Sequence, residues 1–199
     1  MKISFADPKL PKSGTVVVGV LEGKKLSPSA AALDKESNGA LTGAMAASRF
    51  TGKKEETLVM PAPRGLFFDR VVLLGLGKPG GLTPVQVQRL GGAVVPALNA
   101  VGATSALVAV DKVPGTRLTP AEAAANFAHG AMLRSYRFDK YRTKEKPEKK
   151  PTLAELTVLT AGVAAARRAY APLESIGAGI FFTRDLVSEP PNVKYPETL

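Results

Sequence analysis

The stretch Arg70-Val-Val-Leu-Leu-Gly-Leu-Gly-Lys-Pro-Gly-Gly-Leu-Thr-Pro84 decides the fold class of this chain. After Arg70 it begins with an apolar run, and a run that is apolar on both faces is typical of an inner strand of a parallel sheet. Thr83 followed by Pro84 is typical of a helix N-cap with proline at the first helical position. Apolar side chains then recur at spacings of three and four as far as about Val101, which predicts a helix.

The same alternation of strand and helix recurs on both sides of this stretch. Short apolar or β-branched runs predict further strands at residues 15–21, 57–60, 104–110 and 153–160. Ser-Pro and Thr-Pro caps, or small-residue content, predict further helices at 28–35, 39–47 and 120–136, and a last one that ends near 188. Pro172 either begins that last helix or kinks it. The pattern predicts an α/β domain of three layers, in which helices flank both faces of a mixed, mostly parallel central sheet.

Proline residues are concentrated near the end of the chain. Pro190, Pro191 and Pro196 remove backbone donors and fix φ, so the last helix cannot continue past Glu189. The predicted organisation is an α/β domain over residues 1–165, followed by a linker helix and a proline-rich connector over 166–199. Because a connector of this kind normally leads into further structure, we expect this chain to be the front part of a longer protein.

Composition excludes several classes of protein. No stretch approaches the roughly 18 uninterrupted apolar residues that a membrane crossing needs, and the first residues lack the apolar core of a secretory signal. The chain has no cysteine, which excludes disulfides and thiolate metal sites. We therefore expect a cytoplasmic protein without a membrane partner.

Positive charge is concentrated in one segment. The chain carries a net charge of +10, and residues 134–150, from Arg134 to Lys150, hold eight basic and three acidic residues. Tyr136, Phe138 and Tyr141 lie among these cations, so one interpretation is a surface that binds and stacks on nucleic acid. The favoured interpretation is a solvated, mobile loop between a helix and a strand, because charge runs usually keep a loop hydrated.

The turn from Gly75 to Gly80 matches the pattern G-x-G-x-x-G between a strand and a helix. In a dinucleotide site, such glycines let the backbone approach a pyrophosphate at a helix N-terminus. Here the third glycine lies outside the helix, and the acidic residue expected about twenty positions later is missing. The favoured interpretation is a tight turn that needs glycine, with binding of ADP-ribose or another nucleotide as the alternative.

The remaining polar residues give no catalytic pattern. His129 is the single histidine, and a dyad or zinc site normally needs more than one imidazole or cysteine, so a structural role is favoured. Close carboxylate pairs lie beside lysines in polar stretches, which indicates surface solvation. They are Asp34 with Glu36, Glu55 with Glu56, and Glu145 with Glu148. We therefore assign no catalytic, cofactor-binding or metal-binding residue in this chain.

The end of the chain resembles a known family. The segments Arg184-Asp-Leu-Val187, Glu189-Pro-Pro-Asn-Val193 and Pro196-Glu-Thr-Leu199 are similar to the junction between the two domains of the leucyl aminopeptidases. Other segments resemble the N-terminal domain of that family in the same order. They are Gly39-Ala-Leu41, Phe50-Thr-Gly-Lys53, Glu56-Thr-Leu58, Arg70 to Lys78, and Tyr136-Arg-Phe-Asp-Lys-Tyr141.

This resemblance implies a non-catalytic N-terminal domain with a fold like that of macro domains. In the family, the metal ligands and catalytic residues belong to a C-terminal domain, whose motif of the type Asn-Thr-Asp-Ala-Glu-Gly-Arg-Leu does not occur here. The intact protein is expected to remove N-terminal amino acids from peptides with two divalent ions, zinc or manganese, and to form hexamers. The resemblance implies that this domain helps assembly, covers the access route and is inactive alone.

Overall fold

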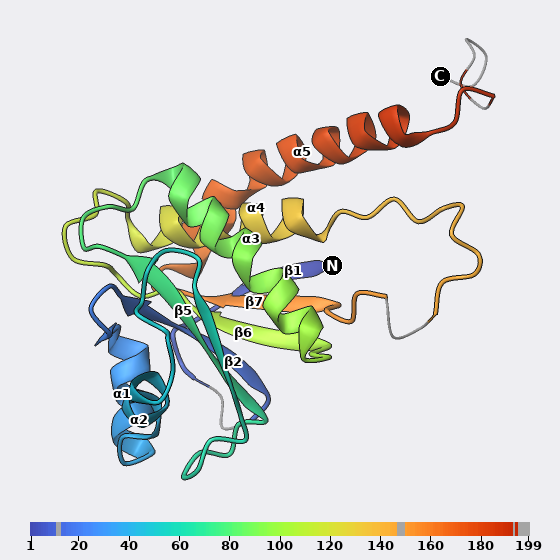
Figure 1. Cartoon of the computed structure of the whole chain (residues 1–199). Coiled ribbons are helices and arrows are strands. Elements are labelled where there is room, and N and C mark those ends of the chain that lie inside the picture. Colours follow the sequence, from blue (N-terminus) through green and yellow to red (C-terminus); the bar gives the residue numbers. More distant parts are fainter. Residues whose placement is uncertain (11–12, 147–149, 193, 195–199) are drawn as a thin grey trace.

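The computed structural model describes residues 1–10, 13–146, 150–192 and 194, and it contains one sheet with helices on both faces (Figure 1). The strands are β1 (Lys2–Ala6), β2 (Thr15–Leu21), β3 (Lys25–Leu26), β4 (Thr57–Pro61), β5 (Arg70–Gly77), β6 (Ser105–Ala109) and β7 (Glu155–Leu159). The helices are α1 (Pro28–Glu36), α2 (Ala40–Ala46), α3 (Pro84–Ala100), α4 (Pro120–Ser135) and α5 (Val163–Ser188). No helix within these described residues combines the length and apolarity needed to cross a bilayer.

The sheet is mixed and mostly parallel, as predicted. Its strand order is β1-β7-β6-β2-β5-β4, and the short β3 pairs with β2. The pairs β4–β5 and β2–β3 are antiparallel, whereas the other pairs are parallel. All residues of β2 are buried, so β2 is the central strand and β5 lies between it and the edge strand β4.

The predicted three layers are confirmed, because alternate residues of the inner strands β2 and β5 point into two separate cores. Val17 of β2 joins the core under α3, α4 and α5, whereas Val16 and Val18 join the core under α1 and α2. Figure 1 shows α1 and α2 on one side of the sheet and α3 on the other. The residues of β2 therefore hold the two helical layers on opposite faces of one sheet.

Helices α3 and α4 pack so closely that two positions accept only glycine. A Cβ atom on Gly91 would lie 2.0 Å from the carbonyl oxygen of Phe127, and one on Gly130 would lie 1.8 Å from that of Gln88. A hydrogen bond of 2.8 Å from Gln88 Nε2 to Asn126 Oδ1 also joins the helices. Direct backbone contact thus fixes the position of α4, from which the basic segment continues.

The last helix is one continuous element. It begins at Val163, with Pro172 inside it, so Pro172 does not begin the helix. Ala166 and Tyr170 are buried in the core, and the ring of Tyr170 lies 5.4 Å from the ring of Phe5 in β1. The first turns of α5 therefore complete the core, and the helix passes residue 165 without a break. Beyond them, α5 extends away from the sheet (Figure 1).

Candidate functional site

The turn from Gly75 to Gly80 lies at the carboxyl end of β5, where α/β proteins commonly bind ligands. Its three motif glycines donate their amide hydrogens within the protein. Gly75 donates to the carbonyl oxygen of Glu56 at 2.8 Å, Gly77 to that of Gly52 at 2.9 Å, and Gly80 to that of Pro114 at 3.0 Å. A phosphate site needs such amides to point at the ligand. These three therefore do not form one.

Close backbone packing explains the glycine requirement of this turn. A Cβ atom on Gly75 would lie 1.9 Å from the carbonyl oxygen of Lys53, and Gly77 has a φ of +78°. A side chain at the first position would clash with the neighbouring chain segment, and one at the second would be strained. The geometry favours the interpretation as a structural turn.

The space beneath this turn is small and apolar. A cavity of about 40 Å³ lies among the sheet, α3 and α4, with Leu76, Val87, Val108 and Phe127 in its wall. Ligand pockets for small molecules and cofactors usually have volumes of roughly 300–1,000 Å³. In this conformation, the cavity is too small for ADP-ribose.

The N-terminus of α1 is a second position where an anion could bind, and the protein's own Asp111 occupies it. The Asp111 carboxylate accepts hydrogen bonds from Ser27 Oγ at 2.6 Å, from the Ser29 amide at 2.9 Å and from Ser29 Oγ at 2.7 Å. A carboxylate is favourable there because the helix N-terminus carries partial positive charge. The contact ties the end of β6 to α1.

The basic segment leaves α4 and folds along the second half of α5. Tyr136 donates a hydrogen bond of 2.8 Å from its hydroxyl to Asp185 Oδ1. The ring of Tyr136 lies 5.2 Å from the ring of Phe181, and the Arg184 guanidinium lies 4.0 Å from its centroid. A base would have to displace these contacts in order to stack on Tyr136.

A second set of contacts joins the segment to the end of α5. Lys140 Nζ lies 2.7 Å from Glu189 Oε1, and the Tyr141 hydroxyl donates to the same carboxylate. The hydrogen bond between Lys140 and Glu189 lowers the pKa of Glu189, and the same hydrogen bond raises the pKa of Lys140. Glu189 thus holds a cation and a phenol of the basic segment at the helix terminus.

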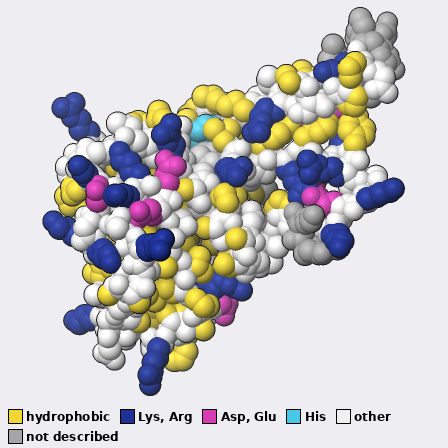
Figure 2. Space-filling view, viewed as in Figure 1, with side chains coloured by type: hydrophobic (Ala, Val, Ile, Leu, Met, Phe, Trp, Pro, Cys, Tyr) yellow, Lys and Arg dark blue, Asp and Glu magenta, His cyan; other side chains and the backbone are white. Residues whose placement is uncertain are grey.

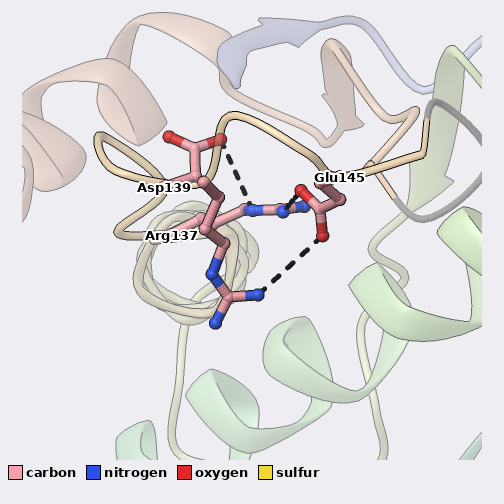
Figure 3. Close-up of polar contacts among 4 residues, drawn as sticks. Arg137, Asp139 and Glu145 are labelled. Atoms are coloured by element: carbon pink, nitrogen blue, oxygen red, sulfur yellow. Dashed lines mark hydrogen bonds and ion pairs between the residues drawn. The ribbon is translucent and has the colours of Figure 1, made fainter.

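Acidic residues within the segment contact its arginines (Figure 3). Arg137 donates to the Glu145 carboxylate, and its Nε lies 3.4 Å from Asp139 Oδ2. Arg142 Nη1 lies 3.8 Å from Glu145 Oε1. The segment connects α4 to β7, as predicted, but its contacts with α5 have no clear sequence signal. Glu148, the predicted neighbour of Glu145, lies outside the described residues.

The residues of α5 that receive these contacts carry a weak sequence signal. Phe181, Asp185 and Glu189 are spaced four residues apart. The first two therefore lie on one face of α5, and the C-cap residue Glu189 lies on the same side. This spacing indicates that one helix face makes specific contacts. It does not indicate which distant segment meets that face.

His129 lies inside the α4–α5 contact. It is 4% exposed, and its Nδ1 has no hydrogen-bond partner among the described residues. Burial lowers the pKa of His129, and the backbone of Leu173 offsets part of that effect. A neutral imidazole packed between helices fits the structural role that the sequence favours.

Comparison with known proteins identifies the family. The sequence model described as the N-terminal domain of the cytosol aminopeptidase family matches residues 17–145. This chain belongs to the cytosol aminopeptidase family. The resemblance inferred from the junction and strand segments is thereby confirmed.

Relatives in the cytosol aminopeptidase family align with nearly the whole chain. A probable cytosol aminopeptidase of Caulobacter vibrioides is 41% identical over 199 residues, which are 99% of this chain and 39% of that protein. One of a Bradyrhizobium strain is 36% identical over 200 residues, with the same two shares. The chain thus spans about two fifths of the length of these relatives.

Solved structures confirm the fold of this cytosol aminopeptidase domain. A mutant of tomato leucine aminopeptidase superposes with a TM-score of 0.81 at 25% identity, over all of this chain and 40% of that one. The bottromycin maturation enzyme BotP gives a TM-score of 0.67 at 24% identity, over 92% of this chain and 34% of its own. This second likeness concerns the fold alone.

Two members of the predicted carboxylate pairs in this cytosol aminopeptidase domain stabilise a helix end and a turn. Asp34 accepts from the Thr42 amide at 2.9 Å, and Glu56 accepts from the Thr51 amide at 2.8 Å. Among the residues that the structure describes, no three His, Cys, Asp or Glu side chains lie close enough together to hold a metal ion. The described side chains therefore do not fit a two-metal centre, which needs several converging carboxylates.

Proposed function

We propose that this chain is the non-catalytic domain of an aminopeptidase and is inactive by itself. In the whole protein, a C-terminal catalytic domain would remove N-terminal amino acids from peptides. The observation that carries the proposal is the match to an N-terminal domain model together with the relatives' much greater length. The contacts that orient α5 support a role in positioning the catalytic domain.

The proposal extends to the organisation of the whole protein. Residues 1–165 would form the accessory domain, and 166–199 would link it to the catalytic domain. Two divalent ions, zinc or manganese, would polarise the scissile carbonyl and activate water in that second domain. A cytoplasmic hexamer, in which this domain helps assembly and limits access to the active site, completes the proposal.

The test compares two proteins with leucine p-nitroanilide and added manganese. One is this chain alone. The other is a chimera in which this chain replaces the matching 39% of the Caulobacter vibrioides relative. We expect turnover by the chimera and none by the chain alone. Turnover by the chain alone that dialysis against a chelator abolishes would contradict the proposal, as would a folded chimera without activity.

A second candidate function is the binding of nucleic acid by the basic segment. The observation that favours it is a cleft of about 540 Å³ whose wall includes Arg134, Arg137 and Lys150, and none of its described lining residues is acidic. Such binding would be electrostatic, so its affinity would fall steeply as salt rises. A gel shift in low and in physiological salt tests it. Absence of a complex in both would exclude this candidate.

A further inference from the structure

The second half of α5 extends beyond the body of the domain. The helix has 26 residues, and the last of its buried residues is Gly177. Beyond that point it projects from the domain beside the basic segment (Figure 1). A solvated helix normally carries charged or polar side chains on the sides that face water.

One side of this projecting half is occupied. A Cβ atom on Gly177 would lie 2.9 Å from Met132 Cε of α4, so the two helices are in close contact there. One and two turns later, Phe181 and Asp185 contact Tyr136. These three positions have a four-residue spacing and therefore define the side of α5 that faces the domain.

The opposite side of the same turns has no charged side chain. At 100° per residue, it is formed by Ile176, Gly179, Phe182, Thr183, Leu186 and Val187, which we call the outer face of α5. Ile176 is 54% exposed, Phe182 62% and Val187 75%. Figure 2 shows hydrophobic side chains along this arm. Large apolar side chains exposed together on one helix face favour burial against a partner.

The two charged residues of this stretch lie away from the outer face. Arg184 packs over the ring of Tyr136, and Asp185 accepts the hydrogen bond from its hydroxyl. Both charges therefore lie on the side toward the basic segment. The outer face has no charged side chain over just over three turns, or roughly 18 Å, and its one hydroxyl, on Thr183, donates to the Gly179 carbonyl oxygen within the helix.

The size of the outer face decides between a second copy and a linked domain. The outer face is a strip about 18 Å long and about 10 Å wide. Its area is far smaller than the roughly 800 Å² that each partner buries in a stable complex of separate chains. A domain on the same polypeptide needs less contact area, because the linker gives it an effective concentration in the millimolar range. The relatives have such additional chain, since this chain spans 39% of their length.

We propose that the outer face of α5 is the docking surface for the catalytic domain of the same polypeptide. This inference rests on the proposed function. The basic segment holds the inner side of α5, so the outer face is presented in a fixed direction next to the point where the chain leaves the helix. Docking there would bury Phe182, Ile176 and Val187 together.

The absence of cysteine from the chain allows a direct test by thiol labelling. Thr183→Cys places a single thiol on the outer face, and Lys35→Cys places one on α1 as a control; both positions are exposed. Labelling rates are measured by mass spectrometry in this chain and in the Caulobacter chimera. We expect similar rates for both thiols in this chain, and at least a tenfold lower rate for Thr183→Cys alone in the chimera.

The outcomes separate this inference from the proposed function. Equal labelling of Thr183→Cys in this chain and in an active chimera would overturn the docking surface and leave the proposed function intact. Selective protection in an inactive chimera would support docking and count against the proposed function. Slow labelling of Thr183→Cys in this chain, together with a dimer by sedimentation, would identify a second copy as the occupant and overturn the inference without any chimera.

Discussion

Tyr136 and Asp185 lie 49 positions apart in the sequence and are joined by a hydrogen bond of 2.8 Å. The bond connects the start of the basic segment to the projecting half of α5. Loss of hydration raises the pKa of Tyr136, and the bond to Asp185 raises it further, so the phenol remains the donor. The basic segment thereby supports the projecting half of α5 through Tyr136.

This support predicts local effects of substitutions at Tyr136. Tyr136→Ala removes the hydrogen bond to Asp185 and the ring contacts with Phe181 and Arg184, whereas Tyr136→Phe removes only the hydrogen bond. We expect hydrogen exchange of the amides in residues 181–188 to accelerate several-fold in the alanine variant and less in the phenylalanine variant. Exchange in α1 serves as the internal control. Unchanged exchange at the end of α5 in both variants would show that the contact does not restrain the helix.

His129 predicts a stability that depends on pH. Its folded pKa lies below the ordinary value of about 6.5, so the unfolded chain binds a proton more readily than the folded one. The contribution of His129 is therefore complete above about pH 6.5 and is lost as the pH falls toward its folded pKa. Urea unfolding at pH 5.5 and 7.5 should show a smaller difference for His129→Leu than for the wild type. An equal difference for both proteins would mean that other groups cause the acid sensitivity.

A pair of glycine substitutions tests the close packing of α3 and α4. Gly130→Ala would place its Cβ atom 1.8 Å from the Gln88 carbonyl oxygen and should destabilise the domain by about 1–3 kcal/mol, the usual range for overpacking. The matched control is Gly43→Ala in α2, where a Cβ atom meets nothing within 4 Å. That change should stabilise by about 0.5–1 kcal/mol, because alanine has the higher helix propensity. Equilibrium denaturation measures both, and the same sign for both variants would refute the packing argument.

The geometry of the Gly75 to Gly80 turn predicts that ADP-ribose and NAD do not bind. The motif amides already donate within the protein, and the cavity beneath them has a volume of about 40 Å³. Isothermal titration at millimolar ligand should give a flat trace for both compounds. Saturable heat with either one would show that the loops above the cavity open.

The parts of the fold that depend on local chemistry can be predicted from the sequence. Thr-Pro pairs predict the starts of α3 and α4 at Pro84 and Pro120, and both helices have a reciprocal capping box, from Thr83 with Gln86 and from Thr119 with Glu122. Every atom of such a cap lies within four residues. The sequence therefore contains the complete signal for these helix starts.

Elements that depend on distant partners escape sequence-based prediction. β1 is a short strand of five residues that exists because it pairs with β7, and Ser4 Oγ and Thr157 Oγ1, which lie 153 positions apart, are 2.9 Å from each other. The contacts of Tyr141 and Lys140 with Glu189 have the same character, since nothing near these two neighbouring residues specifies the distant Glu189. For this reason the sequence predicts the basic segment as a solvated loop, without its contacts to α5.

The late arrival of β7 bears on how the domain forms during translation. The ribosome synthesises roughly 5–20 residues per second, so β1 leaves it roughly 8–30 s before its partner strand exists. During that interval, Phe5 lacks both its neighbouring strand and the ring of Tyr170, which normally cover it. A nascent chain that stalls before β7 would therefore expose an unpaired strand and an uncovered aromatic side chain, which is the kind of surface that chaperones bind.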